Sequence, residues 1–145
     1  MTKVTENYIK MCEKAEEIQK LCQYKMGDWF NGKYGLVVLD VDFKDEYIGD
    51  NWVTRNSMIE DTKEDEGFWL PMQEQLFAMV NFDKLLTFEF SSHKETRTLY
   101  IMRTDGTCSL YKDDNFKGCI LQYVMYEKYN KEWLPKEQKW VSANE

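Results

Sequence analysis

The feature that most constrains the fold of this chain is an apolar stripe in the segment from Asp113 to Trp133. The stripe has five members, at spacings of three and one along the sequence: Phe116, Cys119, Ile120, Tyr123 and Val124. These spacings place all five side chains on one face of an α-helix. Asp113, Asp114 or Asn115 can cap its amino end, and lysines near its carboxyl end suit the helix dipole. Such a helix gains most of its stability from packing, so the chain must supply a sheet or helix for the stripe.

The composition indicates one folded, acidic domain over residues 1–145. The chain is 43% hydrophobic and 15% aromatic, which is enough for a core despite 31% charged residues. Its net charge is −7, and the segment from Asp40 to Glu66 has ten acidic against three basic residues, so this segment carries the whole excess. Proteins that bind nucleic acid cluster lysine and arginine, so no nucleic-acid partner is expected.

The cysteines and the amino terminus favour a cytoplasmic protein. Cys12 and Cys22 lie on one predicted helix, roughly 15 Å apart along its axis, so they cannot form a disulfide with each other. With Cys108 and Cys119 they show no ligand-like spacing, and we expect four reduced thiols. The first ten residues have no apolar signal region, and no run of about 18 apolar residues occurs, so no membrane association is expected.

The periodicity predicts an α+β fold with the order α-βββ-α-βββ-α. We expect a helix over residues 5–23, a short helix after Pro71 and the last helix over 113–133. Turn signals at Asn31-Gly32, at residues 49–51 and at Asp105-Gly106 separate strands, which favours an antiparallel sheet of about five or six strands with the three helices packed on it. We expect a mobile acidic loop at 56–67 and a loose tail after residue 135.

Asp40 and Asp42 are the best candidates for a metal site. Alternate residues of a strand point the same way, and carboxylate oxygens bind hard cations. Asp45 and Glu46 lie nearby, but no spacing fixes a third ligand, and a solvated strand face gives the same pattern. We therefore predict no metal, no cofactor and no catalytic residue, and keep a metal-dependent hydrolase using Asp40 and Asp42 as the alternative.

One short basic cluster could bind an anionic, nucleotide-like ligand. It contains two of the three arginines and the only histidine of the chain. An arginine beside aromatic rings can hold a phosphate and stack on a base. The predicted ligand-binding residues are His93, Lys94, Arg97, Tyr100, Arg103 and Tyr111.

A protein-binding surface is the other natural use of this sequence. The acidic run could occupy a basic surface on a partner, and tryptophan is frequent at interfaces. Trp140, in the tail, is the tryptophan that we expect to be most exposed. The predicted interface residues are Glu60, Asp61, Glu64, Asp65, Glu66 and Trp140.

Three motifs resemble a family of small uncharacterised proteins of phages and prophages of Firmicutes. They are KMGDW at Lys25–Trp29, WLPMQEQL at Trp69–Leu76 and VMYEKYNKEW at Val124–Trp133, and a similar opening helix occurs here as IKMCEKAEEIQK at Ile9–Lys20. The chain departs from the family at Met72–Gln75. The resemblance implies a phage accessory protein rather than a virion or replication component.

The resemblance and the residues together lead to three hypotheses. The first is a non-enzymatic protein that blocks or sequesters a host factor, as an anti-defence protein does. The factor is either a host protein or an anionic nucleotide-like ligand. The second is the hydrolase named above. The third is an interaction module of a phage assembly, and a homo-oligomer is left open.

Overall fold

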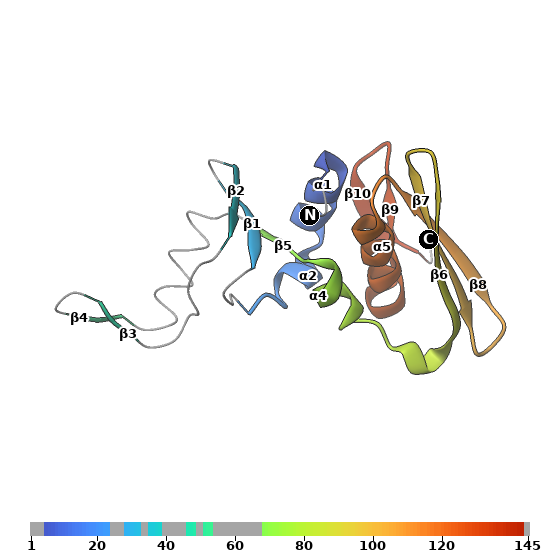
Figure 1. Ribbon diagram of the computed structural model, residues 1–145, viewed down its shortest axis with the longest axis horizontal. Helices are drawn as coiled ribbons and strands as arrows, with labels where there is room; N and C mark the ends of the chain where they lie inside the picture. The colour runs from blue at the N-terminus through green and yellow to red at the C-terminus, as the bar shows by residue number, and fades with distance from the viewer. Residues whose placement is uncertain are drawn as a thin grey trace. The chain divides into compact units, whose positions relative to one another are not determined.

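The structure is a computed structural model that describes residues 5–23, 28–32, 35–38, 46–48, 51–53 and 68–143 (Figure 1). The chain divides into two compact units, a larger one (Met1–Ala15 with Met72–Glu145) and a smaller one (Glu16–Pro71). The predicted α+β class with antiparallel strand pairing is confirmed. In place of one sheet of five or six strands, the described strands form separate sheets of two or three.

The larger unit contains three helices, a 3₁₀ turn and five strands within the described ranges. Its strands form a three-stranded sheet with the order β6-β7-β8 and a separate hairpin of β9 and β10. In chain order the elements are α1 (Glu6–Lys14), α4 (Gln73–Phe77), η1 (Phe82–Lys84), β6 (Leu85–His93), β7 (Thr96–Arg103), β8 (Cys108–Asp113), α5 (Phe116–Tyr129), β9 (Lys131–Leu134) and β10 (Lys139–Ser142).

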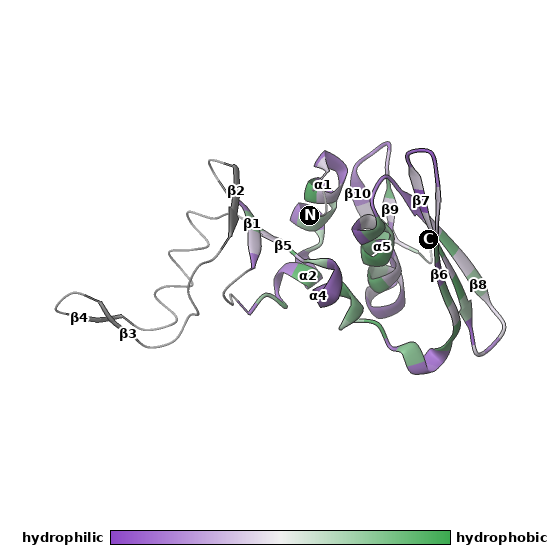
Figure 2. Cartoon of the chain, viewed as in Figure 1, coloured by the Kyte–Doolittle hydropathy of each residue, from purple (hydrophilic) through white to green (hydrophobic). Residues whose placement is uncertain are grey.

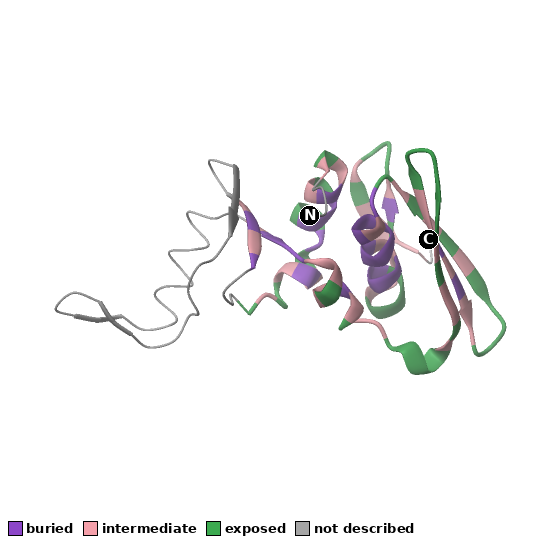
Figure 3. Cartoon of the chain, in the orientation of Figure 1, coloured by how far each residue is buried: buried purple, intermediate pink, exposed green. Residues whose placement is uncertain are grey.

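Helix α5 is the centre of the larger unit. It contacts α1, α4, β7, β8 and β9, and most of its length is buried (Figure 3). Of the predicted stripe, Cys119, Ile120, Tyr123 and Val124 are buried, as expected. Leu121 and Met125 are fully buried as well, because the helix is covered on more than one side, and Figure 2 shows it as mainly hydrophobic.

Both ends of α5 are set by asparagine. The side chain of Asn115 accepts a hydrogen bond from the Lys117 amide at 2.7 Å, as an N-cap does. At the other end, Asn130 adopts a left-handed conformation with φ of +55°. The helix therefore ends at Tyr129, four residues before the predicted end at Trp133, and the next residues form β9.

The amino-terminal helix is shorter than predicted. Helix α1 ends at Lys14, because Ala15 leaves the helical conformation with φ of −87° and ψ of 75°. A separate helix, α2 (Glu16–Gln19), follows. In α1 the residues Tyr8, Met11 and Cys12 are fully buried and form the face that packs into the core.

The sheet β6-β7-β8 packs one face on α5. β7 contributes Leu99 and Ile101, both fully buried, and their register partners on β6 are Phe90 and Phe88. The Phe90 ring lies 4.6 Å from that of Phe116, and the Phe88 ring lies 6.2 Å from that of Tyr123. These edge contacts join the sheet to the predicted stripe of α5.

The expected loose tail after residue 135 is a paired hairpin. β9 and β10 pair with Trp133 opposite Trp140, and their rings lie 5.1 Å apart. The hairpin is also tied to α1, since Lys14 Nζ donates to the Gln138 carbonyl at 2.7 Å and Trp140 Nε1 donates to the Met11 carbonyl at 3.1 Å. The cross-strand tryptophan pair and these bonds order the tail.

The smaller unit contains short strands. β1 (Trp29–Gly32) pairs with β2 (Gly35–Val38) and with β5 (Phe68–Leu70), and β3 (Glu46–Ile48) pairs with β4 (Asn51–Val53). Both predicted hairpins are present, but Gly32 pairs with Gly35 and so belongs to β1 rather than to the turn. Gln19 exchanges two hydrogen bonds with the backbone of Trp69, at 2.7 and 2.8 Å.

Among the residues that the structure describes, no helix has the length and apolar character needed to cross a membrane.

Gly118 gives a test of the packing of α5. Replacing glycine by alanine inside a helix usually stabilises a protein by about 0.5–1 kcal/mol. At Gly118, however, an added Cβ would overlap with Asp113 Oδ2, so the carboxylate must move. We predict that Gly118→Ala lowers the free energy of unfolding by about 2 kcal/mol in urea denaturation. The double variant Asp113→Ala/Gly118→Ala should recover part of this loss, and a gain in stability in the single variant would contradict the packing.

Candidate functional site

The residues predicted to bind an anionic ligand lie on both faces of the sheet. Arg97 and Arg103 are on the face that packs on α5, because Arg97 lies over the Phe116 ring and Arg103 pairs with Glu127. Tyr100 points to the opposite face, since side chains alternate along a strand. Six residues of strand place the two arginines about 20 Å apart, so they cannot serve one small ligand together.

His93 and Lys94 lie at the turn between β6 and β7, at the end of β7 away from Arg103. His93 is the last residue of β6, and Lys94 follows with φ of +55°. Both side chains are exposed, and the Lys94 carbonyl accepts a hydrogen bond from Arg97 at 3.0 Å. Of the six predicted residues, the structure brings Arg97 to Lys94 at this turn and, separately, Arg103 to Tyr111.

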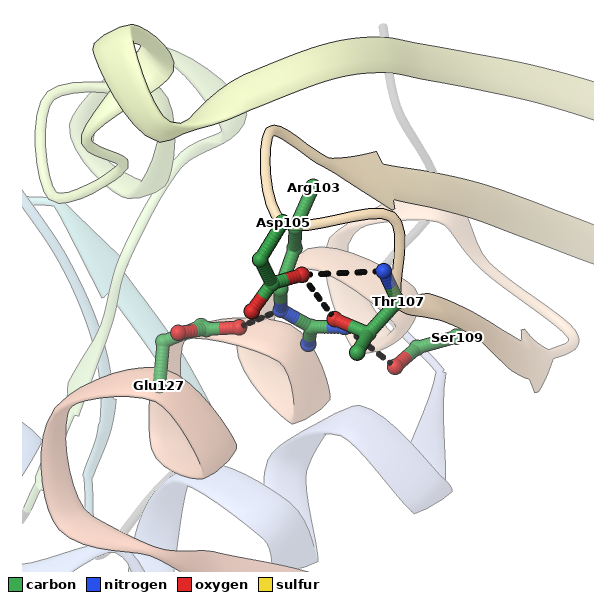
Figure 4. A network of polar contacts seen from close by, with 5 residues as sticks. All are labelled: Arg103, Asp105, Thr107, Ser109 and Glu127. Atoms are coloured by element: carbon green, nitrogen blue, oxygen red, sulfur yellow. Dashed lines mark hydrogen bonds and ion pairs between the residues drawn. The ribbon is translucent and has the colours of Figure 1, made fainter.

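Arg103 is the centre of a polar network at the other end of β7 (Figure 4). Its Nε donates to Glu127 Oε1 at 2.5 Å, and its Nη1 donates to Ser109 Oγ at 2.9 Å. Asp105 supports the network by accepting from the amide and the hydroxyl of Thr107, at 2.9 and 2.6 Å. We call these five residues the Arg103 network.

The guanidinium of Arg103 still has a free donor. Its Nη2 is buried and has no hydrogen-bond partner within the described part of the chain. Burial alone would lower the pKa of Arg103, but the hydrogen bond and the charge of Glu127 raise it above its ordinary value. The guanidinium also lies 5.6 Å from the centre of the Tyr126 ring, a cation–π contact. Arg103 is thus a fixed, fully charged group.

A cavity of about 530 Å³ lies beside the Arg103 network, between residues 78–84 and the carboxyl-terminal half of α5. Its volume is within the range of small-molecule sites. We call it the α5 cavity. Its lining consists of Ala78, Met79, Val80, Asn81, Lys84, Tyr123, Val124, Glu127 and Lys128.

Glu127 joins the cavity to the network. It lines the α5 cavity, and its carboxylate accepts the hydrogen bond from Arg103. The backbone of Lys84 is held beside that of Thr104, the residue after Arg103, because the Thr104 amide donates a hydrogen bond to the Lys84 carbonyl at 2.9 Å. The lining contains two lysines, Lys84 and Lys128, and one carboxylate, Glu127, so the formal charge of this cavity is positive in an acidic protein.

Besides its charged residues, the lining contains Asn81, Tyr123 and four apolar residues, Ala78, Met79, Val80 and Val124. Tyr123 is almost completely buried, and burial raises the pKa of its hydroxyl to about 12, so the ring stays neutral. Val124 is buried in α5 beside it, and the segment 78–80 supplies small and medium apolar side chains. Amines at the edge and an apolar wall suit a ligand with a charged group and a planar ring.

Sequence reasoning missed most of the α5 cavity. Lys84 and Lys128 are 44 residues apart in the sequence, and no local pattern relates them. Lys117, which is not a member of the predicted stripe, is only 6% exposed, and its Nζ lies 5.1 Å from the centre of the Tyr8 ring. Burial lowers the pKa of this amine.

The predicted interface residues are described only in part. Glu60, Asp61, Glu64, Asp65 and Glu66, and the loop at 56–67, lie outside the described residues. Trp140, expected to be exposed, is half-buried and bonded to Met11, as described above. Its contacts with α1 and Trp133 explain why it is ordered.

The predicted metal-binding carboxylates also lie outside the residues that the structure describes. Asp40, Asp42 and Asp45 lie in undescribed segments, and nothing is described of the Glu46 side chain. Over the described ranges, no group of three or more histidine, cysteine, aspartate or glutamate residues could hold a metal ion. The four cysteines, all in the described ranges, form no disulfide, and burial raises the pKa of the Cys12 and Cys119 thiols to about 12.

Asp113 is a second polar group with unusual surroundings. Asn7 donates to its Oδ1 at 2.6 Å, but its Oδ2 is buried and has no hydrogen-bond partner among the described residues. Burial, with the nearby charge of Asp114, raises the pKa of Asp113 to about 6. Asp113 is the last residue of β8, so its hydrogen bond with Asn7 links α1 to the end of this strand.

Comparison of the chain with protein-family models, with curated proteins and with solved structures found no match. The likeness to phage and prophage proteins therefore stays a prediction from the three sequence motifs. The function is inferred below from the α5 cavity and its charges.

The raised pKa of Asp113 predicts how stability depends on pH. The folded state holds this proton more tightly than the unfolded chain, whose carboxyl has a pKa near 3.8. Stability from this group is therefore present below about pH 4 and is lost as the pH rises to about 6. We predict that Asp113→Asn is more stable than the wild type at pH 7. Its free energy of unfolding should also lack the part of the decrease between about pH 4 and pH 6 that Asp113 causes, as measured by urea denaturation at several pH values.

Asp83→Asn, which changes an exposed aspartate of η1, is the control and should keep the wild-type slope. An unchanged slope in Asp113→Asn would show that Asp113 does not have this pKa.

Proposed function

We propose that this protein is a phage-encoded accessory protein that binds a small anionic, nucleotide-like ligand in the α5 cavity and sequesters it in the cytoplasm of the host. The observation that carries the proposal is the position of Lys84 and Lys128 at a cavity of about 530 Å³ with an apolar wall. A nucleotide has the matching parts, since phosphates attract amines and a base packs on apolar or aromatic side chains.

The charges at the site support an anion in particular. Lys84 and Lys128 are exposed amines at the cavity, and each can donate charge-assisted hydrogen bonds to phosphate oxygens. Arg103 lies behind Glu127 and partly neutralises this carboxylate, so the carboxylate repels an incoming anion less. The net charge of the whole chain is −7, so this local excess of positive charge runs against the composition.

The wall of the cavity supports the base-binding part. Tyr123 and Val124 are almost completely buried, so the apolar surface open to a base comes from the half-buried Met79 and Val80. Side chains that are already partly packed lose little freedom when a ligand arrives, which favours binding. The proposal is one of binding without turnover, and its phage and host parts rest on the sequence motifs.

Calorimetric titration with nucleoside mono-, di- and triphosphates and cyclic dinucleotides tests the proposal. We predict that at least one of these anions binds the wild type, and that Lys84→Ala and Lys128→Ala each weaken its binding about tenfold, or about 1.4 kcal/mol. Lys94→Ala is the matched control, because it removes an exposed lysine at the other end of β7, and it should bind as the wild type does.

Two results would contradict the proposal. One is the absence of binding by every anion in the set to the folded wild type. The other is binding that Lys84→Ala and Lys128→Ala leave unchanged, which would place the ligand elsewhere in the chain.

A further inference from the structure

The sheet β6-β7-β8 has a second face, opposite to α5, that no described residue covers. Its strand register arranges nine residues in three rows, each row crossing the strands β6, β7 and β8 in that order. All nine are exposed or half-exposed. We call this surface the open face, and its rows are Thr87, Met102 and Cys108, then Glu89, Tyr100 and Leu110, then Ser91, Thr98 and Lys112.

The open face is apolar along its centre and charged at its edges. Tyr100 and Met102 lie on the central strand, and Leu110 beside them is 61% exposed. Tyr100 Oη lies 3.3 Å from Cys108 Sγ, so the aromatic side chain lies along the sheet toward β8. Large apolar side chains gathered on one exposed surface are typical of an interaction site.

The charged residues of the open face are placed so that this face can pair with the same face of a second copy of the chain. The acidic residue, Glu89, is on β6, and the basic residue, Lys112, is on β8, one row away. If two copies meet face to face about a two-fold axis parallel to β7, then β6 of one copy lies over β8 of the other. Each Glu89 then lies over Leu110 of the other copy and diagonal to its Lys112, while Tyr100 and Met102 meet their own equivalents at the axis.

We propose that the open face is an interface between two copies of this chain, packed sheet on sheet about a two-fold axis parallel to β7. A two-fold axis across the strands would instead place Glu89 over Glu89 and Lys112 over Cys108, which brings like charges together. The charge pattern therefore selects the axis along β7. The proposal does not depend on the α5 cavity, which lies on the other side of the sheet.

The size of the surface sets the strength of this dimer. Three rows on three strands give nine residues a side, fewer than the roughly 20–30 of a standard interface. A contact of this size forms a reversible dimer rather than a permanent one. The dimer is accordingly expected at high protein concentration, with monomer at low concentration.

Sedimentation velocity over a wide range of concentration, up to the millimolar range, tests the interface. The wild type should shift from monomer to dimer, and Leu110→Glu should weaken the dimer at least tenfold because it places a carboxylate opposite Glu89. Leu21→Glu is the matched control: it changes another exposed leucine, 41% exposed and in the smaller unit, and should dimerise as the wild type does. Circular dichroism checks that each variant is folded.

Cysteine cross-linking tests the axis. In a Cys22→Ser/Cys108→Ser background, Met102→Cys should form covalent dimers with a short bis-maleimide reagent, because the two copies of residue 102 meet at the axis. Glu89→Cys alone should not, whereas a mixture of Glu89→Cys and Leu110→Cys should. A wild type that stays monomeric at every concentration overturns the proposal, and so does a dimer that Leu110→Glu leaves intact. A dimer in which Glu89→Cys cross-links to itself and Met102→Cys does not would also overturn it.

Discussion

Burial of α5 against β7 on one side and α1 on another is the interaction on which the larger unit depends. Ile120, Leu121, Val124 and Met125 are all 0–1% exposed, and full burial of such a side chain contributes about 1.5–3 kcal/mol. Their combined contribution is comparable with the whole stability of a small domain, about 5–15 kcal/mol. α5 also supplies the ring partners of Phe90 and Phe88 on β6, namely Phe116 and Tyr123, and it contacts α1.

The same helix also provides the functional features of this unit. Its carboxyl-terminal half supplies Tyr123, Glu127 and Lys128 to the α5 cavity, and its contact with one sheet face leaves the other face open. Glu127 is held by Arg103 at the end of β7, so the wall of the cavity is fixed to the sheet. The cavity and the open face are thus consequences of how one helix covers one side of a three-stranded sheet.

Local sequence patterns predicted the parts of the fold that depend on neighbours in the chain. The stripe of α5, the Asn115 cap and the turn at Asp105-Gly106 follow from spacing and turn chemistry. The end of α5 was placed too late because Asn130 turns the chain into β9, and pairing with β10 then outweighs helix propensity. The pairing of β9 with β10 depends on residues later in the chain, so the local sequence around Asn130 does not reveal it.

The candidate site could be predicted less well for a related reason. Six residues close in sequence were taken as one cluster, but strand alternation and the length of β7 separate them. The cavity instead joins residues 78–84 to α5, and Lys117 is buried because Tyr8 lies next to it in the fold. Such neighbours are set by tertiary packing, which one sequence does not reveal.

Native-state hydrogen exchange tests most directly whether α5 is the centre of the larger unit. The amides of Ile120, Leu121 and Val124 should be among the slowest to exchange, and they should exchange together with those of Leu99 and Ile101 on β7, through one global opening. Exchange of the α5 amides through a separate, much less costly opening, while β7 stays protected, would contradict this account.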